Sequence, residues 1–480
     1  MFGWKEPDIV NYLNMVEFKK SDQFKQEYCA SIIKIPKVVD IEGSDFLGKV
    51  TIDGLSLVVR KDQIKEGDVV FYAANETQLD VQFLKANNLY SDSTLNEDQT
   101  KKGYFPSNGR VRTIKLKGVQ SFGYLFTLSE LQKAYGIGDI ELTPGIEFDM
   151  VRDVLFIKAY VPYTKPKVND YKSTKGARKR AERIDRIIPG EFMFHYDTQL
   201  MAKNLDRLSF NDIITLTVKL HGTSFIFGNV WSNIPVKLPW YKRLVNLFHK
   251  KYPKYVEGFS EIYSSRTVIK NKWACPGGGF YTSDIYGEWA ELLKGKIPEG
   301  YTIYGEIIGY LSGTSKFIQK NYDYGCRPGT SKLMIYRVSQ EARLEEKKIK
   351  KEWNVEDVKE FTLGLMKKYP ELQDKLHPID ILYHGPLSEF APLDRTQHWQ
   401  ENFLKAIQED EGDEELGMEK DEPLCKNKVP REGVVLRIDN DPMEEAFKVK
   451  CQKFLTREAK EIDKGNVDME MSQGYGNDTL

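Results

Sequence analysis

One lysine of this chain lies where it could act as a nucleophile. Lys219 falls within the stretch T-V-K-L-H-G-T-S-F (residues 217–225), between an alternating apolar run and a tight turn at Gly222. A second apolar run, residues 225–230, follows at once, so the pattern predicts a strand, a turn and a strand. A lysine held at the end of a strand by the walls of a sheet can attack an electrophile once its amine has lost a proton. The short pattern K-x-x-G also fits a surface lysine before a hairpin turn, so a nucleophilic Lys219 needs supporting groups elsewhere.

Four later charged residues could supply that support. Glu306 lies in Y-T-I-Y-G-E-I-I-G, and Glu432 opens E-G-V-V-L-R. Lys448 and Lys450 alternate in F-K-V-K, so their side chains point to the same side of a strand. There they can neutralise a phosphate under attack and lower the pKa of Lys219. The two glutamates can hold Mg²⁺ or ribose hydroxyls, because Mg²⁺ needs few protein oxygens. The set suits the attack of an amine on a phosphorus centre.

The order of these segments resembles a known family. Six segments are similar to its motifs I, Ia, III, IIIa, IV and V: K-L-H-G-T-S, S-S-R, Y-G-E-I-I-G, K-L-M-I-Y-R, E-G-V-V-L-R and F-K-V-K. This is the covalent nucleotidyltransferase superfamily of ATP-dependent RNA ligases, DNA ligases and mRNA capping enzymes. The resemblance covers roughly residues 190–455. It implies an α+β chain whose nucleotidyltransferase domain, residues 189–456, has ATP-grasp-like antiparallel sheets with helices.

The resemblance implies a role for each charged residue named above. Lys219 would attack ATP and become a lysyl-AMP. Glu306 would contact the ribose or a metal, and Glu432 would contact the metal. Lys448 and Lys450 would contact the α-phosphate. The implied cofactors are ATP, as AMP donor, and Mg²⁺, for which Mn²⁺ can substitute.

Six further residues take roles from the same resemblance. Gly222 belongs to the nucleotide-binding motif, and Tyr336 would stack on the adenine, since an aromatic ring packs on any base. Arg266 would contact AMP or the RNA 5′-phosphate, although a structural salt bridge remains an alternative. His221 is implied in a step after lysine adenylylation, with a turn-capping histidine as its alternative. His195 and Asp197, in F-H-Y-D-T, belong to a segment similar to one that precedes the nucleophile in relatives, and both would support the nucleotide pocket.

The details favour one branch of the family. His221 stands where DNA ligases and capping enzymes usually carry Asp, and I-Q-K (318–320) followed by Y-G (324–325) resembles nick-sealing RNA ligases. Close relatives often have Glu before the nucleophile, where this chain has Val218, so the chemistry is better supported than the choice of ATP. The polar tail, residues 457–480, is too short for a C-terminal OB domain. We expect an ATP-dependent RNA ligase that seals 3′-OH/5′-phosphate ends; a DNA ligase, a guanylyltransferase and a non-catalytic RNA-binding relative are the alternatives.

Regular elements must hold these residues in place. Strand-like runs recur at residues 213–220, 225–231, 301–308, 332–338, 433–438 and 446–451. A helix is predicted from the apolar face at 355, 358, 361 and 365, opened by Asn354 and stopped by Pro370. Trp399, Phe403 and Ile407 make a second helical face.

The N-terminal part, residues 1–162, is predicted to form an OB-like β-barrel domain. Residues 28–72 alternate short apolar runs with turns about every ten residues. Residues 110–117 alternate between basic or polar and apolar positions, which predicts a strand with a cationic face of Arg110, Arg112, Lys115 and Lys117. That face suits a groove that follows single-stranded nucleic acid, and a solvated strand face is the alternative.

A basic segment separates the two predicted domains. Residues 163–188 are low in apolar side chains; nine lysines and arginines stand against three acids, a surplus of about six positive charges. Lys175, Arg178, Lys179 and Arg180 lie at its centre. Such a surplus suits contact with RNA phosphates, and a solubilising linker is the alternative.

The composition limits the remaining choices. The net charge is −1, so an anionic partner must meet local basic patches rather than a global field. No apolar run is long enough to span a membrane, and the N-terminus lacks a secretory signal. The five cysteines are scattered, without C-x-x-C, which favours a reducing compartment. We expect a soluble, cytoplasmic monomer whose partner is RNA, as a nicked duplex, and no membrane.

Overall fold

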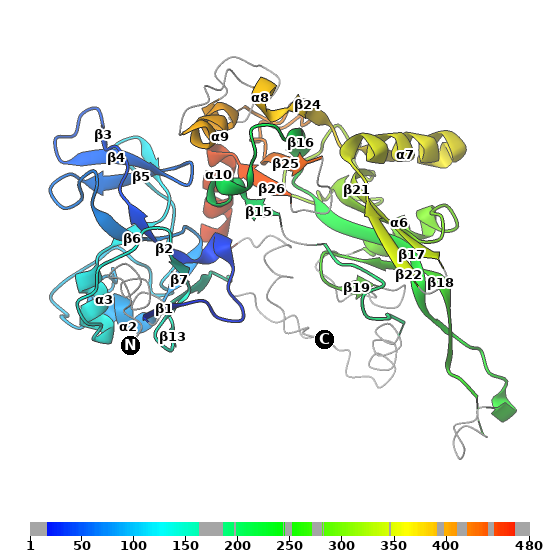
Figure 1. Cartoon of the computed structure of the whole chain (residues 1–480), viewed down its shortest axis with the longest axis horizontal. Helices are drawn as coiled ribbons and strands as arrows, with labels where there is room; N and C mark the ends of the chain where they lie inside the picture. Colours follow the sequence, from blue (N-terminus) through cyan, green and yellow to red (C-terminus); the bar gives the residue numbers. More distant parts are fainter. Residues whose placement is uncertain are drawn as a thin grey trace, which may run out of the picture. The chain divides into compact units, whose positions relative to one another are not determined.

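The chain folds into two compact units, shown in Figure 1. The first unit comprises residues 1–162, 199–205 and 455–466, and the second comprises residues 163–198, 206–454 and 467–480. The computed structural model describes residues 17–162, 186–195, 198–242, 244, 252–270, 281, 283–344, 347–390, 398–409, 420–439 and 446–465.

Short strands build the first unit. One sheet has the order β10 (Tyr124–Phe126), β6 (Val69–Ala73), β2 (Ala30–Lys34), β11 (Glu147–Phe148). A second joins β3 (Val39–Asp40), β4 (Leu47–Ile52) and β5 (Leu55–Arg60), and a third joins β1 (Phe18–Lys19), β12 (Met150–Val151) and β13 (Val154–Leu155). Two pairs complete the strands: β8 (Ile114–Leu116) with β9 (Val119–Ser121), and β14 (Ile157–Ala159) with β7 (Thr77–Leu79). The remaining elements are β15 (Gln199–Leu200) and the helices α2 (Val81–Ala86) and α3 (Leu128–Tyr135).

The central strand β6 is buried on both faces because successive side chains point to opposite sides. Phe71 and Ala73 enter one hydrophobic cluster, while Val70 and Tyr72 enter another. The short strands predicted within residues 28–72 are confirmed. The strand predicted at residues 110–117 is wrong in extent, since β8 holds only Ile114–Leu116.

Two sheets form the frame of the second unit. One has the order β26 (Phe447–Lys450), β25 (Gly433–Ile438), β16 (Ile213–Lys219), β24 (Ile381–Pro386). The larger has the order β19 (Ile269–Lys270), β18 (Tyr255–Ser264), β17 (Thr223–Pro235), β20 (Tyr301–Gly309), β21 (Ser331–Leu344), β22 (Lys347–Glu352), with β23 (Leu376–Pro378) parallel to β21. The helices are α6 (Ile285–Leu293), α7 (Val355–Lys368), α8 (Leu387–Phe390) and α9 (Trp399–Glu409). Helix α10 (Gln452–Asp463) begins in this unit, and its residues from Leu455 onward belong to the first unit. The six predicted strands and both predicted helices are therefore present; the first seven residues of the predicted polar tail lie in α10.

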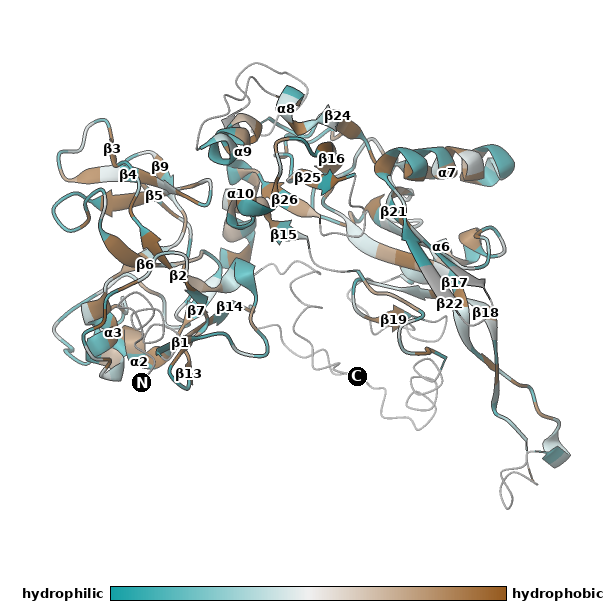
Figure 2. Cartoon of the chain, in the orientation of Figure 1, coloured by the Kyte–Doolittle hydropathy of each residue, from teal (hydrophilic) through white to brown (hydrophobic). Residues whose placement is uncertain are grey.

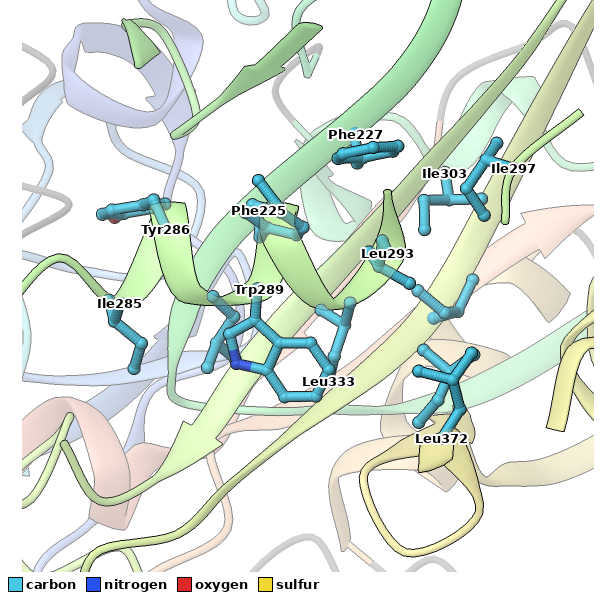
Figure 3. Packing of buried hydrophobic residues seen from close by; sticks show 14 of the residues in the cluster. Phe225, Phe227, Ile285, Tyr286, Trp289, Leu293, Ile297, Ile303, Leu333 and Leu372 are labelled. Atoms are coloured by element: carbon cyan, nitrogen blue, oxygen red, sulfur yellow. The ribbon is translucent and has the colours of Figure 1, made fainter. Parts of the chain in front are cut away.

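The two faces of the larger sheet pack against different hydrophobic clusters. Phe225 and Phe227 of β17 point into the main core, where Trp289 and Leu293 of α6 cover them (Figure 3). Ile226, between the two phenylalanines, points to the opposite face and joins a smaller cluster. Hydrophobic residues gather on the strands of this sheet, while α7 carries hydrophilic residues along its length (Figure 2).

Asn354 explains where α7 begins. Its side chain accepts a hydrogen bond of 2.8 Å from the backbone N–H of Asp357, which satisfies one of the donors left open at a helix start. Among the described residues, no helix is both long enough and apolar enough to cross a bilayer. Cys29, Cys326, Cys425 and Cys451 are free thiols.

Candidate active site

The turn after Lys219 carries the chain from one sheet of the second unit to the other. Lys219 is the last residue of β16, in the smaller sheet, and β17 of the larger sheet begins at Thr223. Gly222 lies where no side chain fits, since a Cβ there would come within 2.4 Å of the Ile307 carbonyl oxygen. The prediction of strand, turn and strand is confirmed.

Strand register brings the predicted phosphate ligands beside Lys219. Lys219 pairs with Gly433 of β25, and Gly433 in turn pairs with Lys450 of β26. Directly paired residues of antiparallel strands share one face of a sheet, and Lys448 is two residues from Lys450 on that face. Gly433 adds no side chain between the two cations. A Cβ at Gly433 would come within 2.0 Å of the Val449 carbonyl oxygen, which excludes larger residues.

Glu432 directly contacts the proposed nucleophile. One carboxylate oxygen, Oε1, lies 2.5 Å from Nζ of Lys219, and the other, Oε2, lies 3.8 Å from Nδ1 of His221. The Glu432 side chain is only 5 % exposed. This ion pair holds the Lys219 amine against a buried carboxylate.

Glu306 approaches the same turn from the larger sheet. It lies on β20 opposite Ser224 and is buried. Its Oε1 accepts a hydrogen bond of 3.1 Å from the backbone N–H of Gly222. The two predicted metal ligands, Glu306 and Glu432, therefore come from different sheets and meet the turn at residues 219–222.

The two carboxylates fit a hard divalent cation that keeps most of its waters. Within the described part of the chain, no cluster of three or more His, Cys, Asp and Glu side chains could hold a metal ion. Mg²⁺ and Mn²⁺ prefer oxygen ligands, and Mg²⁺ is commonly held by one or two carboxylates together with substrate phosphates. The predicted ligand pair is consistent with that mode of binding.

Three aromatic residues and one amide fix the turn, and none of them was among the predicted site residues. The hydroxyl of Tyr324 accepts a hydrogen bond of 2.8 Å from the backbone N–H of His221. Gln319 donates through Nε2 to the carbonyl of Gly222, also at 2.8 Å. The His221 ring lies edge-on between Tyr322 and Phe454, with centroid distances of 4.9 and 5.0 Å. Burial raises the pKa of Tyr324 well above its ordinary value, so its hydroxyl stays neutral. The sequence contained a signal for Gln319 and Tyr324, because residues 318–320 and 324–325 resembled a family pattern, but it did not reveal these contacts.

Tyr336 occupies a bulge in β21. The register between β20 and β21 shifts at Tyr304 and Gly305, whose partners are Arg337 and Ile335, so Tyr336 is the extra residue of the bulged strand. A β-bulge of this kind redirects a side chain. Tyr336 packs on the cluster that contains Tyr304, which places it on the sheet face that carries Glu306. The ring of His195 lies 5.5 Å from that of Tyr336.

The remaining residues predicted to bind the nucleotide or RNA differ in their exposure to solvent and in whether the structure describes them. Arg266 is partly exposed in the turn between β18 and β19, and its role stays a prediction. In the first unit, Arg112, Lys115 and Lys117 are exposed, as expected. Four predicted RNA contacts in the basic segment lie outside the described residues: Lys175, Arg178, Lys179 and Arg180.

Arg110 does not share the exposed face predicted for it. Its side chain is only 3 % exposed and forms hydrogen bonds of 2.7 and 2.8 Å with Glu76 and of 2.7 Å with Asp463. These carboxylates satisfy the guanidinium inside the first unit. The prediction of Arg110 on an open cationic face is wrong, and we remove it from the RNA-contacting set.

Comparison with known proteins identifies one domain. A family model described as an OB-fold domain matches residues 29–128. These residues form an OB-fold domain. The chain is thus a mixed α+β protein with an N-terminal OB fold and a second, sheet-rich unit. No curated protein matches the chain.

Among solved structures, the chain is similar to the Naegleria gruberi RNA ligase. The ligase with PPi has 15 % sequence identity and a TM-score of 0.47, and the match covers 90 % of this chain and 99 % of the ligase. A mutant of the same ligase with ATP and Mn gives 15 % identity and a TM-score of 0.48, over 90 % of this chain and 99 % of that one.

Proposed function

We propose that this chain is an ATP-dependent RNA ligase that joins 3′-OH and 5′-phosphate RNA ends. In the first step the Lys219 amine attacks the α-phosphorus of ATP; an N–P bond forms, and pyrophosphate leaves. In the second step the RNA 5′-phosphate displaces the lysine and takes the AMP. In the third step the RNA 3′-OH attacks that phosphate, and AMP leaves. Each step is an in-line displacement aided by positioning and charge neutralisation.

The row Lys219–Gly433–Lys450, with Glu432 against Lys219, is the observation that best supports this proposal. A nucleophilic amine needs a second cation near the phosphate that it attacks, and strand register provides Lys450 on the same face. An amine that starts as an ammonium also needs a proton acceptor. The Glu432 carboxylate, 2.5 Å from Nζ, is suitably near to receive that proton.

The other site residues have roles that follow from their positions. Lys448 and Lys450 would bind the α-phosphate, and Tyr336 would stack on the adenine. A divalent cation held by Glu306 and Glu432 would supply positive charge beside the phosphates and compete with Lys219 for the Glu432 carboxylate. Burial of Glu306 against the Gly222 N–H keeps its carboxylate aimed at the turn.

His221 is poised for the steps that follow adenylylation. Aromatic edges restrict its ring on two sides, and Glu432 lies near its Nδ1. A restrained imidazole beside a carboxylate can exchange a proton with the phosphate or hydroxyl that enters after pyrophosphate has left. In this proposal His221 acts on transfer of AMP to RNA rather than on lysine adenylylation.

A joining assay tests the proposal. Labelled RNA with a 5′-phosphate is presented as a nicked duplex, as a single strand and across a DNA template, with ATP and Mg²⁺. We expect joining of the nicked RNA duplex by the parent chain, none by Lys219→Ala, and normal joining by Lys367→Ala, a control on the exposed side of α7. Joining of DNA 3′-OH nicks but not RNA nicks would indicate a DNA ligase instead. A covalent adduct formed from GTP but not ATP would indicate a guanylyltransferase, and no product of any kind would indicate a non-catalytic relative.

A further inference from the structure

Strands β17 and β18 extend beyond the sheet to which they belong. β17 pairs with β20 only from Thr223 to Gly228, but it pairs with β18 as far as Pro235, opposite Tyr255. The pairing continues in a hydrogen bond of 2.9 Å from the Val236 N–H to the Lys254 carbonyl. In Figure 1 the two strands leave the rest of the second unit as a ribbon, here called the β17–β18 arm (residues 229–242 and 252–261).

The end of this arm differs in composition from the rest of the chain. Residues 234–256 contain six lysines and arginines and no aspartate or glutamate, in a protein whose net charge is −1. The same stretch contains five aromatic residues. A basic segment interleaved with aromatic residues is typical of surfaces that bind single-stranded nucleic acid.

Two large aromatic side chains and two lysines at the arm's end are exposed to solvent. Trp240 is 74 % exposed and Tyr241 is 53 % exposed. Their rings are nearly perpendicular, with centroids 6.2 Å apart, so the two rings present faces in different directions. Lys237 and Lys254 are exposed as well, and Nζ of Lys242 lies 4.9 Å from the ring centroid of Tyr252. Two large aromatic side chains left in water beside lysines indicate a surface that a partner covers.

We propose that the end of the β17–β18 arm binds an unpaired strand of RNA. Bases stack on Trp240 and Tyr241, and Lys237, Lys242 and Lys254 contact the phosphates. An unpaired strand fits better than a duplex, because the faces of bases within a duplex are already covered by their neighbours. That the nucleic acid is RNA rests on the function proposed above; the stacking and charge arguments rest on the arm alone.

The length of β17 separates this surface from the adenylylation site. The strand has 13 residues, and an extended strand rises about 3.3 Å per residue, so its far end lies roughly 40 Å along the strand from Gly222. A nucleotide bound at Lys219 is too small to reach that far. The arm therefore acts on RNA away from the ends being joined and takes no part in the reaction of Lys219 with ATP.

Fluorescence anisotropy with the whole chain tests this proposal. The probes are a fluorescein-labelled unpaired RNA of mixed sequence and a blunt duplex of the same sequence. For the double variant Trp240→Ala/Tyr241→Ala we expect about a tenfold loss of affinity for the unpaired strand and unchanged affinity for the duplex. For the triple variant Lys237→Gln/Lys242→Gln/Lys254→Gln we expect the slope of log K against log salt to fall by about 2. The matched control, Lys359→Gln/Lys367→Gln/Lys368→Gln on α7, should behave like the parent.

Two outcomes would overturn the proposal: unchanged affinity of both arm variants for the unpaired strand, or an equal loss of affinity for the duplex. Adduct formation with α-labelled ATP, measured in parallel, separates this proposal from the proposed function. If the parent forms no adduct but the arm variants lose RNA affinity, the arm proposal stands and the ligase proposal fails. If the parent forms the adduct and the arm variants bind RNA normally, only the arm proposal fails.

Discussion

At the residue scale, the site depends on contacts that fix the turn beside Lys219. The types of the charged residues could be predicted from the sequence, since a lysine nucleophile, two carboxylates and two lysines occur in a recognisable order. The contacts between these residues could not be predicted from the sequence. The contact between Glu432 and Nζ of Lys219 depends on which strands pair and in which register. The same is true of the hydrogen bond that the Tyr324 hydroxyl accepts from the His221 N–H.

Tyr324→Phe tests how much the turn depends on one hydroxyl. The change removes the acceptor for the His221 N–H and leaves a backbone donor without that partner, which costs about 1–3 kcal/mol. We expect the free energy of unfolding, measured with urea, to fall by that amount, and adduct formation with ATP to slow. Tyr301→Phe in the same unit serves as the control. Equal stability and equal adduct rates for Tyr324→Phe and the parent would show that the hydroxyl does not hold the turn.

At the element scale, the passage of the chain between two sheets explains why Gly222 is a glycine. The carbonyl of Ile307 on β20 occupies the position where a side chain would begin. The sequence predicted a tight turn at this position, but it did not reveal that the neighbouring strand closes over it. A tight turn can be predicted from the types of its own residues. Its contact with a strand that follows about 80 residues later depends on the sheet topology, which the local residues do not determine.

Gly222→Ala should therefore destabilise the second unit. The backbone oxygen that the new Cβ meets cannot move without disturbing β20, so we expect a loss of about 1–3 kcal/mol in the free energy of unfolding. Gly364→Ala is the matched control, since Gly364 lies within α7 with open space around it and should gain roughly 0.5–1 kcal/mol from alanine. Equal effects of the two substitutions on thermal unfolding would contradict this account of the turn.

The edge strand β23 gives a prediction for pH. Burial, followed by the nearby charge of Lys332, lowers the pKa of His377 below its ordinary value of 6.5. The folded state therefore prefers neutral His377. The contribution of His377 to the stability of the fold is fully present above the pKa of the unfolded state, and it is lost as the pH falls below that pKa. We expect urea unfolding to show the parent less stable at about pH 5.5 than at about pH 7.5, with a smaller difference in His377→Phe. If His377→Phe shows the same difference in stability between the two pH values as the parent, groups other than His377 cause the pH dependence.

At the scale of the whole molecule, the sequence predicted an OB fold joined to a sheet-rich second unit, and the periodic strands and helices are present. The wrong prediction for Arg110 shows that local sequence patterns do not reveal long-range contacts. Alternation of residue types around position 110 resembles an exposed strand, but the partner Asp463 lies 353 residues later in the chain. No local pattern predicts an ion pair over that separation, and the same holds for the pairing of Lys219 with Gly433.

Arg110 and Arg112 should behave differently despite their proximity in the sequence. Arg110→Ala leaves the buried carboxylate of Glu76 without its guanidinium, and loss of one partner of a buried pair costs about 3–5 kcal/mol. Arg112→Ala removes an exposed side chain and should change stability by less than about 0.5 kcal/mol. Thermal unfolding of the two variants makes the comparison. Similar melting temperatures for both would mean that the Arg110–Glu76 pair does not stabilise the first unit.

The position of the covalent adduct tests the central claim most directly. The whole chain is incubated with α-labelled ATP and Mg²⁺, digested, and the labelled peptide identified by mass spectrometry. We predict a single acid-labile, lysine-linked AMP on Lys219, absent from Lys219→Ala and present in Lys367→Ala. AMP on any other residue, or a labelled adduct that persists in Lys219→Ala, would contradict the assignment of Lys219 as the nucleophile.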